Sequence, residues 1–378
     1  MNSSGHSPYA ISADKVDEIP KRGWIPVTVP GAVKGWKALS ERFGSLPFKK
    51  LLEPAIDYAR NGYPVSAEIA RMWKKALNAI PNSEEFKSWY DTFTFDGKTP
   101  EPGQMICMPK LADALEKITD TKTDALYYGE LADRIDEESK RFGGFLRKQD
   151  LEDHKVEWVN PIHVDYHGYQ VWELPPNGQG IVALMALNVL NNFQFKDRDV
   201  DCIHTQMEAL KMAFADAKEY VTDPKCMNMP VDDLISVDYG KQRASQIGHL
   251  ALPPRVDKPH GSGTVYLCIA DKDGNMVSYI QSNYMGFGSG IVVDGVSLQN
   301  RGYDFSLDPS HVNYLMPHKK TYHTIIPGFL TKDDKPVGPF GVMGGYMQPQ
   351  GHMQVVTNMI DFHLNPQMAL DAKRFQWI

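Results

Sequence analysis

The sequence predicts an α+β fold. Apolar residues recur at helical spacing through most of the stretch from Ala32 to Arg141, and pairs of short β-type segments separated by turn residues recur in the rest of the chain. The 378 residues, 42% of them hydrophobic, suffice to bury a large core in one large domain or two. Helices in one set and hairpins in another indicate a layered arrangement.

The elements follow from local patterns in chain order. Gly44 and Gly62 end the first two helical patterns, and Ser66 is a good N-cap for the third. The aromatic and polar segment 82–104 is expected to form a surface lobe or part of a substrate-pocket wall. We expect helices over residues 32–43, 47–61, 66–80, 110–118, 125–141, 181–190, 203–220 and 366–375, and strands over residues 162–166, 169–173, 264–270, 276–282, 324–330 and 339–343.

Composition excludes several classes of function. The formal net charge of −7, without a cluster of Lys and Arg, argues against a nucleic-acid or membrane-surface role. The four cysteines are scattered and form no zinc or disulfide pattern, and no metal or cofactor is expected. No apolar run approaches the roughly 20 residues of a membrane span. The first residues have no signal-peptide pattern, which favours a cytoplasmic location if the chain begins where the protein does.

One predicted hairpin contains the candidate catalytic residues. Two β-type runs flank five turn-forming residues, 271–275, so the runs are expected to pair antiparallel. If Ala270 faces Met276 across this turn, the register sets Thr264 opposite Ser282. Directly opposed residues lie roughly 4.5–5.5 Å apart at Cβ. Two hydroxyl groups then lie within reach of each other at the open end of the hairpin.

Two interpretations of this hairpin follow from the residues alone. Ser and Thr pairs are common on sheets, so it is consistent with an ordinary hairpin. Alternatively, Thr264 is an amino-terminal nucleophile: cleavage of the Gly263–Thr264 bond would free an α-amine that serves as base for the hydroxyl of the same residue. The Lys, Asp and Pro rich stretch 252–260 resembles an exposed linker, where a cleavable bond is expected.

With these features the chain resembles the γ-glutamyltranspeptidase family of amino-terminal-nucleophile hydrolases. The resemblance implies a four-layer αββα sandwich, made as one precursor that cleaves itself into a large-subunit portion, 1–263, and a small-subunit portion, 264–378. It extends from about Val29 to Phe375. The similar segments are residues 29–35, 54–59 with Gly62, the loop at Pro175 and Pro176, 208–224, 264–282, 286–291, 298–300, 304–306 and 344–345.

The resemblance also implies roles for individual residues. Thr264 would be the nucleophile and, through its freed amine, the base, and Ser282 takes the place of a second Thr that supports the nucleophile. Gly344 and Gly345 match the pair whose backbone N–H groups stabilise the oxyanion. Asp304 matches the acid that binds the α-amino group of the substrate. Without the resemblance, the Gly-Gly pair would be a plain turn and Asp304 a turn cap.

Other positions depart from the family pattern. The family holds the substrate α-carboxylate with an Arg, where this chain has Ser4, and with a Ser-Ser pair, where it has His323 and Thr324. Tyr284 replaces an Asn, and Arg301 replaces a Gln. The residues that hold the substrate α-carboxylate in the family pattern are therefore missing from this chain. Arg301 either replaces the lost cation, since a guanidinium suits a carboxylate, or is a solvated surface residue.

The chain is also shorter than the family pattern at both ends, as expected of a fragment or a degenerate member. It begins after the first strand and helix of that pattern and stops at Ile378, before its closing strands. Missing edge strands would expose unpaired backbone groups.

We therefore predict an autoprocessing threonine amidase or acyltransferase that acts on small-molecule amides. Its expected donors are γ-glutamyl amides such as glutathione, with other N-acyl or lactam-side-chain amides as the rival class. The two subunits would stay together after cleavage, and a homodimer is left open. An uncleaved, inactive relative is the alternative outside enzymes. Phosphate binding by residues 286–290 is disfavoured, because a strand rather than a helix follows them.

Overall fold

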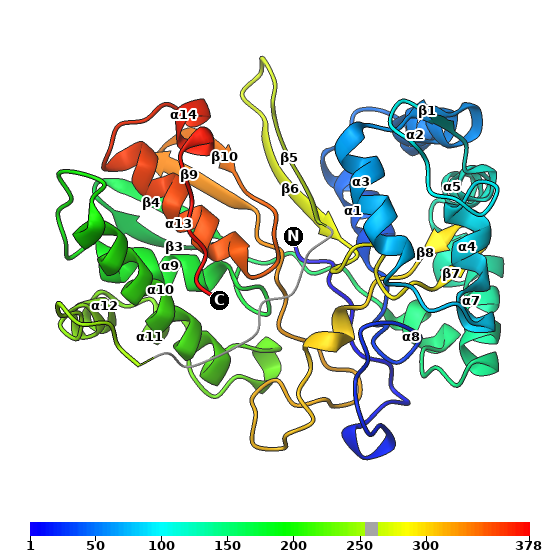
Figure 1. Ribbon diagram of the computed structural model, residues 1–378, viewed down its shortest axis with the longest axis horizontal. Helices are drawn as coiled ribbons and strands as arrows, with labels where there is room; N and C mark the ends of the chain where they lie inside the picture. Colours follow the sequence, from blue (N-terminus) through cyan, green and yellow to red (C-terminus); the bar gives the residue numbers. More distant parts are fainter. Residues whose placement is uncertain (254–263) are drawn as a thin grey trace. The chain divides into compact units, whose positions relative to one another are not determined.

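The structure is a computed structural model that describes residues 1–253 and 264–378 (Figure 1). It contains helices and antiparallel strands, which confirms the α+β prediction. The chain forms two compact units. Unit 1 comprises Met1–Trp158, Asn283–Leu307 and Leu315–Lys320, and unit 2 comprises Val159–Ser282, Asp308–Tyr314 and Thr321–Ile378. Both units contain residues from either side of the Gly263–Thr264 bond, so the expected division into large and small portions is a different partition from the compact units.

Unit 1 is mainly helical. Its first helix, α1 (Ala32–Phe43), has the predicted bounds and ends where the Gly44 N–H bonds to the Ser40 carbonyl. Helix α3 (Ala67–Leu77) begins at Ser66, whose hydroxyl accepts from the Ile69 N–H. The other elements are η1 (Ala13–Lys15), α2 (Phe48–Asn61), β1 (Tyr63–Pro64), η2 (Glu84–Phe86), β2 (Met105–Ile106), α5 (Pro109–Asp120), α8 (Lys148–Asp153), β7 (Val292–Val293), β8 (Val296–Ser297) and η4 (Arg301–Asp304).

Most residues of the aromatic segment 82–104 are exposed, as expected of a surface lobe, but Phe86 and Trp89 are buried. The segment contains helix α4 (Lys87–Phe93), and Trp89 within it is fully buried. The Phe287 ring lies 4.8 Å from Phe93 and 5.2 Å from Trp89, centroid to centroid. Aromatic pairs at such distances stabilise a core beyond their buried area. These side chains are therefore interior packing residues of unit 1.

The helix expected over residues 125–141 is two helices. Helix α6 (Asp124–Tyr127) ends at Tyr127, and α7 (Glu130–Arg141) begins after Gly129. Tyr127 is fully buried and donates its hydroxyl proton to the Pro30 carbonyl at 2.8 Å. The apolar pattern runs across the break, so only this tertiary structure distinguishes two short helices from one long one.

Unit 2 contains a four-stranded antiparallel sheet in the order β10-β9-β4-β3. The predicted hairpin of β3 (Ile162–Tyr166) and β4 (Tyr169–Glu173) is confirmed. The last two strands differ from the expected ranges: β9 is Gly328–Lys332 and β10 is Lys335–Phe340. Pro327 lacks an N–H, so the stretch before β9 is poorly suited to a strand ladder. The register of β10 shifts between Pro336 and Gly338.

Buried helices pack with this sheet. Helix α9 (Gly180–Leu190) contacts β3 and β4, and α10 (Val200–Tyr220) and α13 (Met347–Ile360) pack against α9. Every residue of α9 is buried, as expected for a helix that is apolar on all sides. Glu173 at the end of β4 and His352 in α13 are both fully buried and pair at 2.5 Å. The remaining helices are η3 (Pro224–Cys226), α11 (Val231–Leu234), α12 (Val237–Ala244) and α14 (Pro366–Asp371).

In the described ranges, 1–253 and 264–378, no helix combines the length and the apolar character that a membrane span requires. No group of three or more His, Cys, Asp or Glu side chains there is arranged to hold a metal ion.

Candidate active site

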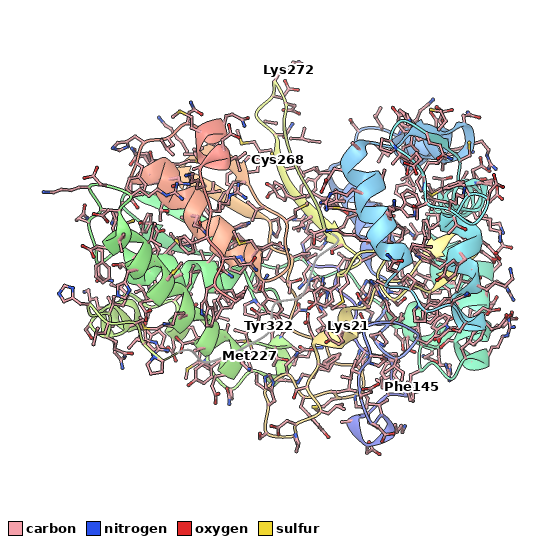
Figure 2. All side chains as sticks on the ribbon, viewed as in Figure 1. Lys21, Phe145, Met227, Cys268, Lys272 and Tyr322 are labelled. Atoms are coloured by element: carbon pink, nitrogen blue, oxygen red, sulfur yellow. The ribbon has the colours of Figure 1, made fainter. Side chains whose placement is uncertain are left out.

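The hairpin of β5 (Thr264–Ala270) and β6 (Met276–Ser282) has the predicted register, with Ala270 opposite Met276 and Thr264 opposite Ser282. Figure 2 shows Cys268 on this hairpin and Lys272 at its tip. The Asp271 carboxylate closes the turn by accepting from the Asp273 and Asn275 N–H groups, each at 2.9 Å. The five turn residues therefore fix the register that brings the two hydroxyl residues together.

The predicted hydroxyl pair forms at the open end of the hairpin. Thr264 Oγ1 lies 3.1 Å from Ser282 Oγ, a hydrogen-bond distance, and Thr264 is 7% exposed. Either hydroxyl can donate to the other. Gly263 lies outside the described residues, so the structure leaves the predicted cleavage site untested. The arrangement suits a nucleophile that is supported by a second hydroxyl.

Tyr266, two residues after Thr264 in β5, connects the hairpin to the rest of unit 2. Its hydroxyl lies 3.1 Å from Ser278 Oγ, which donates to the Gly328 carbonyl at 2.8 Å. Burial raises the pKa of Tyr266, so the phenol stays neutral. A Cβ on Gly341 would lie only 2.4 Å from the Tyr266 ring. The backbone that leaves β10 toward Gly344 is therefore fixed directly beside β5.

Gly344 and Gly345 form a tight turn before α13. Their φ angles are +136° and +59°, and a Cβ on Gly344 would lie 2.9 Å from Met347 Cβ, so the first position requires glycine. Within the described residues, neither glycine N–H donates a hydrogen bond, although Gly345 is buried. Buried N–H groups without a partner are uncommon. Both groups are available to an oxyanion, as the predicted role requires.

His323 and Thr324 lie in the same unit. The His323 N–H donates to the Asn177 carbonyl at 2.8 Å, and its carbonyl accepts from the Gln179 N–H at 2.9 Å. Thr324 is fully buried. The sequence alone does not single out Gln179, because one polar residue in a loop rich in Pro and Gly carries no signal of its partners. Its side-chain amide donates to the carbonyls of both Thr324 and Gly345.

Tyr284, Arg301 and Asp304 form a buried group in unit 1. The Tyr284 hydroxyl donates to Asp304 Oδ1 at 2.6 Å, and Arg301 Nη1 lies 3.4 Å from Asp304 Oδ2. The Arg301 guanidinium also lies 4.0 Å from the centroid of the Tyr284 ring. The Arg301 and Asp304 side chains are each 3% exposed, so the interpretation of Arg301 as a solvated surface residue is wrong. Burial, followed by the Asp304 charge, raises the pKa of Tyr284.

The remaining candidate, Ser4, also lies in unit 1. Its hydroxyl donates to Asn2 Oδ1 at 2.7 Å, and its N–H donates to the same oxygen at 2.9 Å. The structure thus divides the predicted site residues between the two units. Unit 2 holds Thr264, Ser282, His323, Thr324, Gly344 and Gly345, and unit 1 holds Ser4, Tyr284, Arg301 and Asp304. Their roles in substrate binding stay predictions.

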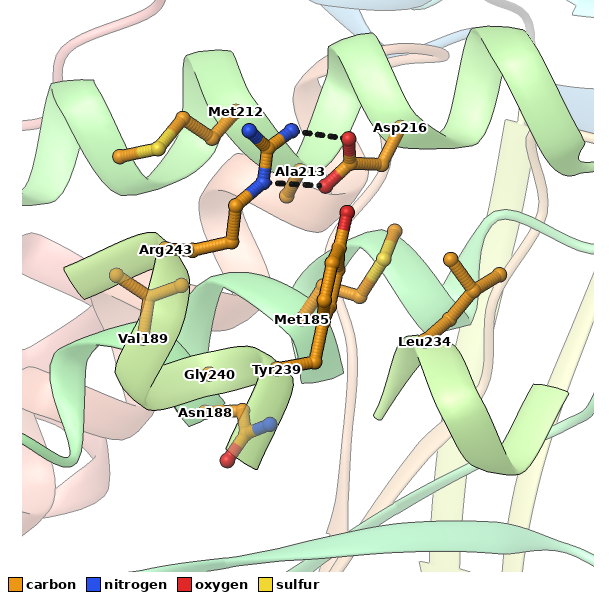
Figure 3. Close-up of a pocket in the computed structure, with 10 residues that line it drawn as sticks. All are labelled: Met185, Asn188, Val189, Met212, Ala213, Asp216, Leu234, Tyr239, Gly240 and Arg243. Carbon is orange, nitrogen blue, oxygen red and sulfur yellow. Dashed lines mark hydrogen bonds and ion pairs between the residues drawn. The ribbon is translucent and has the colours of Figure 1, made fainter. Parts of the chain in front are cut away.

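Unit 2 also contains a small pocket (Figure 3). It is lined by residues of α9, α10, α11 and α12, and it has room for about one water molecule. Arg243 and Asp216 form a bidentate ion pair at its edge, with Nε 3.0 Å from Oδ2. None of the predicted site residues lines this pocket, so we regard it as a packing feature.

Comparison with known proteins places the chain among amide-cleaving enzymes. The family model described as gamma-glutamyltranspeptidase matches residues 1–378. The chain is 39% identical to the glutathione hydrolase-like YwrD proenzyme of Bacillus subtilis, over 100% of this chain and 73% of that protein. It is 33% identical to the oxamate amidohydrolase proenzyme of Klebsiella pneumoniae, over 90% of this chain and 66% of that protein.

Solved structures agree. The crystal structure of cephalosporin acylase from Bacillus halodurans superposes with a TM-score of 0.96 at 51% identity, covering 100% of this chain and 72% of that one. The chain thus spans about two thirds to three quarters of the length of the proteins named here. It belongs to the gamma-glutamyltranspeptidase family of amino-terminal-nucleophile amidohydrolases.

Proposed function

We propose that this chain is an autoprocessing amidase or acyltransferase whose nucleophile is Thr264. The observation that carries the proposal is the contact of 3.1 Å between Thr264 Oγ1 and Ser282 Oγ at the first residue of β5. The available N–H groups of Gly344 and Gly345 in the same unit support it. The names of two relatives, which describe proenzymes, support self-cleavage.

The proposed chemistry has two stages. Hydrolysis of the Gly263–Thr264 peptide bond consumes one water molecule and leaves a carboxylate on Gly263 and an α-amine on Thr264. In each turnover that amine takes the proton from Oγ1 as the oxygen attacks the substrate carbonyl, and the N–H groups of Gly344 and Gly345 stabilise the oxyanion. The protonated leaving amine departs, and an acyl ester forms on Thr264. Water or a second amine then takes the acyl group and restores the hydroxyl.

The two products of cleavage should stay together. Strand β4 lies before the cleaved bond, and it pairs with β9, which lies after it, through Gln170–Thr331, Val171–Leu330 and Trp172–Phe329. This ladder and the buried helices around it do not depend on the severed bond. We therefore propose a tightly associated pair of subunits. Size-exclusion chromatography of the purified, cleaved protein on a calibrated column distinguishes a single pair of subunits from a homodimer of such pairs.

A specific observation also favours a second class of acyl donor. In the family pattern, Asp304 would bind the α-ammonium of a γ-glutamyl group. Here one oxygen of Asp304 accepts from Tyr284, and the other faces Arg301. A carboxylate that is already compensated attracts a substrate ammonium less. Donors without an α-ammonium, such as glutaryl amides, are therefore the second candidate, beside γ-glutamyl amides such as glutathione.

Intact-mass spectrometry tests the proposal. The purified wild-type chain is expected to yield a fragment that begins at Thr264, whereas Thr264→Ala is expected to stay intact and inactive. Thr264→Ser keeps a hydroxyl and serves as the control, with slower cleavage and residual activity on γ-glutamyl- and glutaryl-p-nitroanilide. A wild-type chain that stays intact after long incubation, or is cut at another bond, would refute the proposal and favour an uncleaved binding protein.

A further inference from the structure

Gln179 holds together two segments of the proposed active site. The residue is completely buried immediately before α9. Its Nε2 donates to the Thr324 carbonyl at 2.7 Å and to the Gly345 carbonyl at 2.8 Å. Its Oε1 accepts from the Tyr322 hydroxyl at 3.2 Å. One side-chain amide thus uses both of its donors and its acceptor on two segments that are about twenty residues apart in the chain.

The backbone around Gln179 is itself fixed. Gly178 forms a parallel bridge with His323, with the Gln179 N–H bonded to the His323 carbonyl and the His323 N–H to the Asn177 carbonyl. Asn177 also donates from Nδ2 to the Thr321 carbonyl at 2.8 Å. The amide of Gln179 therefore extends from a rigid base. A flexible side chain would not hold its two carbonyl acceptors in a fixed relation.

The Gly344–Gly345 turn needs such an anchor. Glycine has no side chain to restrict rotation of its peptide groups, and both residues have positive φ angles. Donors to an oxyanion stabilise it well only when their orientation is set before the reaction. Besides the Gln348 N–H in the first turn of α13, at 3.1 Å, the Gly345 carbonyl accepts from Gln179. This second bond ties the turn to a different part of unit 2.

We propose that Gln179 is a positioning residue, which orients the Gly344 and Gly345 N–H groups and locks them to the segment that carries His323 and Thr324. The inference rests on the proposed function, because it assigns those N–H groups to the oxyanion. The stacked rings of Tyr322 and Tyr346, with centroids 5.9 Å apart and planes at 14°, join the same two segments. Loss of the amide should therefore weaken transition-state stabilisation more than substrate binding.

The first test is Gln179→Met, which keeps the length of the side chain and removes both donors. After Thr264 is confirmed as a new amino terminus, we expect kcat on glutaryl- or γ-glutamyl-p-nitroanilide to fall about 10-fold or more, with a smaller change in KM. The loss should stay below the roughly 10²–10³-fold cost of removing an oxyanion donor itself. Slower self-cleavage is expected too, since it passes through the same kind of oxyanion.

Gln354 provides a matched control. It is buried in α13, its Nε2 donates to the carbonyls of Gln350 at 3.1 Å and Phe375 at 2.9 Å, and its Oε1 accepts from the Phe375 N–H. Gln354→Met therefore removes a similar buried amide from the same unit without touching Gly345 or Thr324. The two variants should lose similar stability in urea, and only Gln179→Met should lose kcat.

Other outcomes separate the two proposals. A cleaved Gln179→Met with wild-type kcat, or equal losses of kcat in both variants, overturns the role of Gln179 and leaves Thr264 as nucleophile. A wild-type chain that is never cleaved at Thr264 overturns the proposed function itself. If Gln179→Met does not fold, Tyr322→Phe replaces it, because that change removes the hydroxyl that donates to Oε1 and keeps the Gln179 amide. A fall in kcat smaller than 2-fold in that variant also counts against the inference.

Discussion

Arg301 and Asp304 show how one substitution changes the character of a site. Their ion pair is buried in unit 1, and Tyr284 covers both partners. Removing one partner of such a pair leaves a buried charge uncompensated, which typically destabilises a protein by about 3–5 kcal/mol. A substrate cation that replaces the lost partner would recover part of that energy. Under the proposed function, we therefore expect the pair to influence the choice of acyl donor.

We predict that Arg301→Gln shifts donor selectivity toward γ-glutamyl groups. The change restores the residue of the family pattern and removes the positive charge that compensates Asp304, so this carboxylate should attract an α-ammonium more strongly. A hydrogen bond to a charged group contributes about 1.5–3 kcal/mol, so the ratio of kcat/KM for γ-glutamyl- over glutaryl-p-nitroanilide should rise about 10-fold or more. Steady-state kinetics with both substrates measures this ratio.

The ion pair in Figure 3 supplies the control for this prediction. Arg243→Gln breaks an Arg–Asp pair in unit 2 that borders none of the predicted site residues. It should lower stability without changing the selectivity ratio. Equal ratios in both variants and the wild type would contradict the assignment of Asp304 to the donor site.

At the scale of elements, the β5–β6 turn sets the register on which the hydroxyl pair depends. Gly274 has φ +84°, and no atom lies within 4 Å of the position that its Cβ would occupy. The left-handed conformation, rather than crowding, therefore limits this position. A residue with a Cβ in this conformation destabilises the turn by about 1–2 kcal/mol. Asn destabilises it less than Ala, because the Asn side chain can form local hydrogen bonds.

We expect Gly274→Ala to loosen the turn by about 1 kcal/mol and Gly274→Asn to loosen it less. Native-state hydrogen exchange measures this directly at the Asp271 N–H, which bonds to the Asn275 carbonyl at 3.0 Å. Exchange there should speed up about 5-fold in the Ala variant. Lys272→Ala, at an exposed position of the same turn, is the control. Identical exchange in all variants would show that the turn does not require glycine.

Element bounds followed the sequence where a local signal exists. Helix α1 (Ala32–Phe43) and hairpin β3–β4 matched because glycine stops and alternating apolar residues are local features. Helix α13 (Met347–Ile360) was missed. It is buried on nearly every side, so it has no apolar stripe, and it contains Gly351, where a Cβ would lie 2.5 Å from Val342 Cγ2. Close packing at this position requires glycine, although glycine lowers the helix propensity of the segment.

At the scale of the whole molecule, a buried imidazole couples folding to pH. His154 is 1% exposed in unit 1, and burial, followed by the charges of His6, Lys34 and Lys320, lowers its pKa from 6.5 to about 3. The unfolded chain takes up a proton at His154 near pH 6.5, and the folded chain does so only near pH 3. The unfolded state therefore binds more protons between these values, and stability falls as the pH drops below 6.5.

We predict that the wild-type protein loses about 2–3 kcal/mol more than His154→Gln between pH 7 and 4.5, since each pH unit in this window contributes up to about 1.4 kcal/mol. Urea unfolding at both pH values gives the difference. The exposed His249→Gln is the control and should follow the wild type. If His154→Gln loses as much stability in acid as the wild type, another group accounts for the acid sensitivity.

The sequence by itself determined the α+β class, most of the helices, and the register that sets Thr264 opposite Ser282, because spacing, turn residues and glycine stops act over a few residues. Only the tertiary structure decided that Arg301 is buried against Asp304 and that Gln179 joins Thr324 to Gly345. The burial of the Arg301–Asp304 pair and the contacts of Gln179 depend on which distant segments meet when the core packs. A contact between residues that are more than a hundred positions apart produces no periodic pattern in the sequence. A hairpin, by contrast, has its pairing set by its own turn residues.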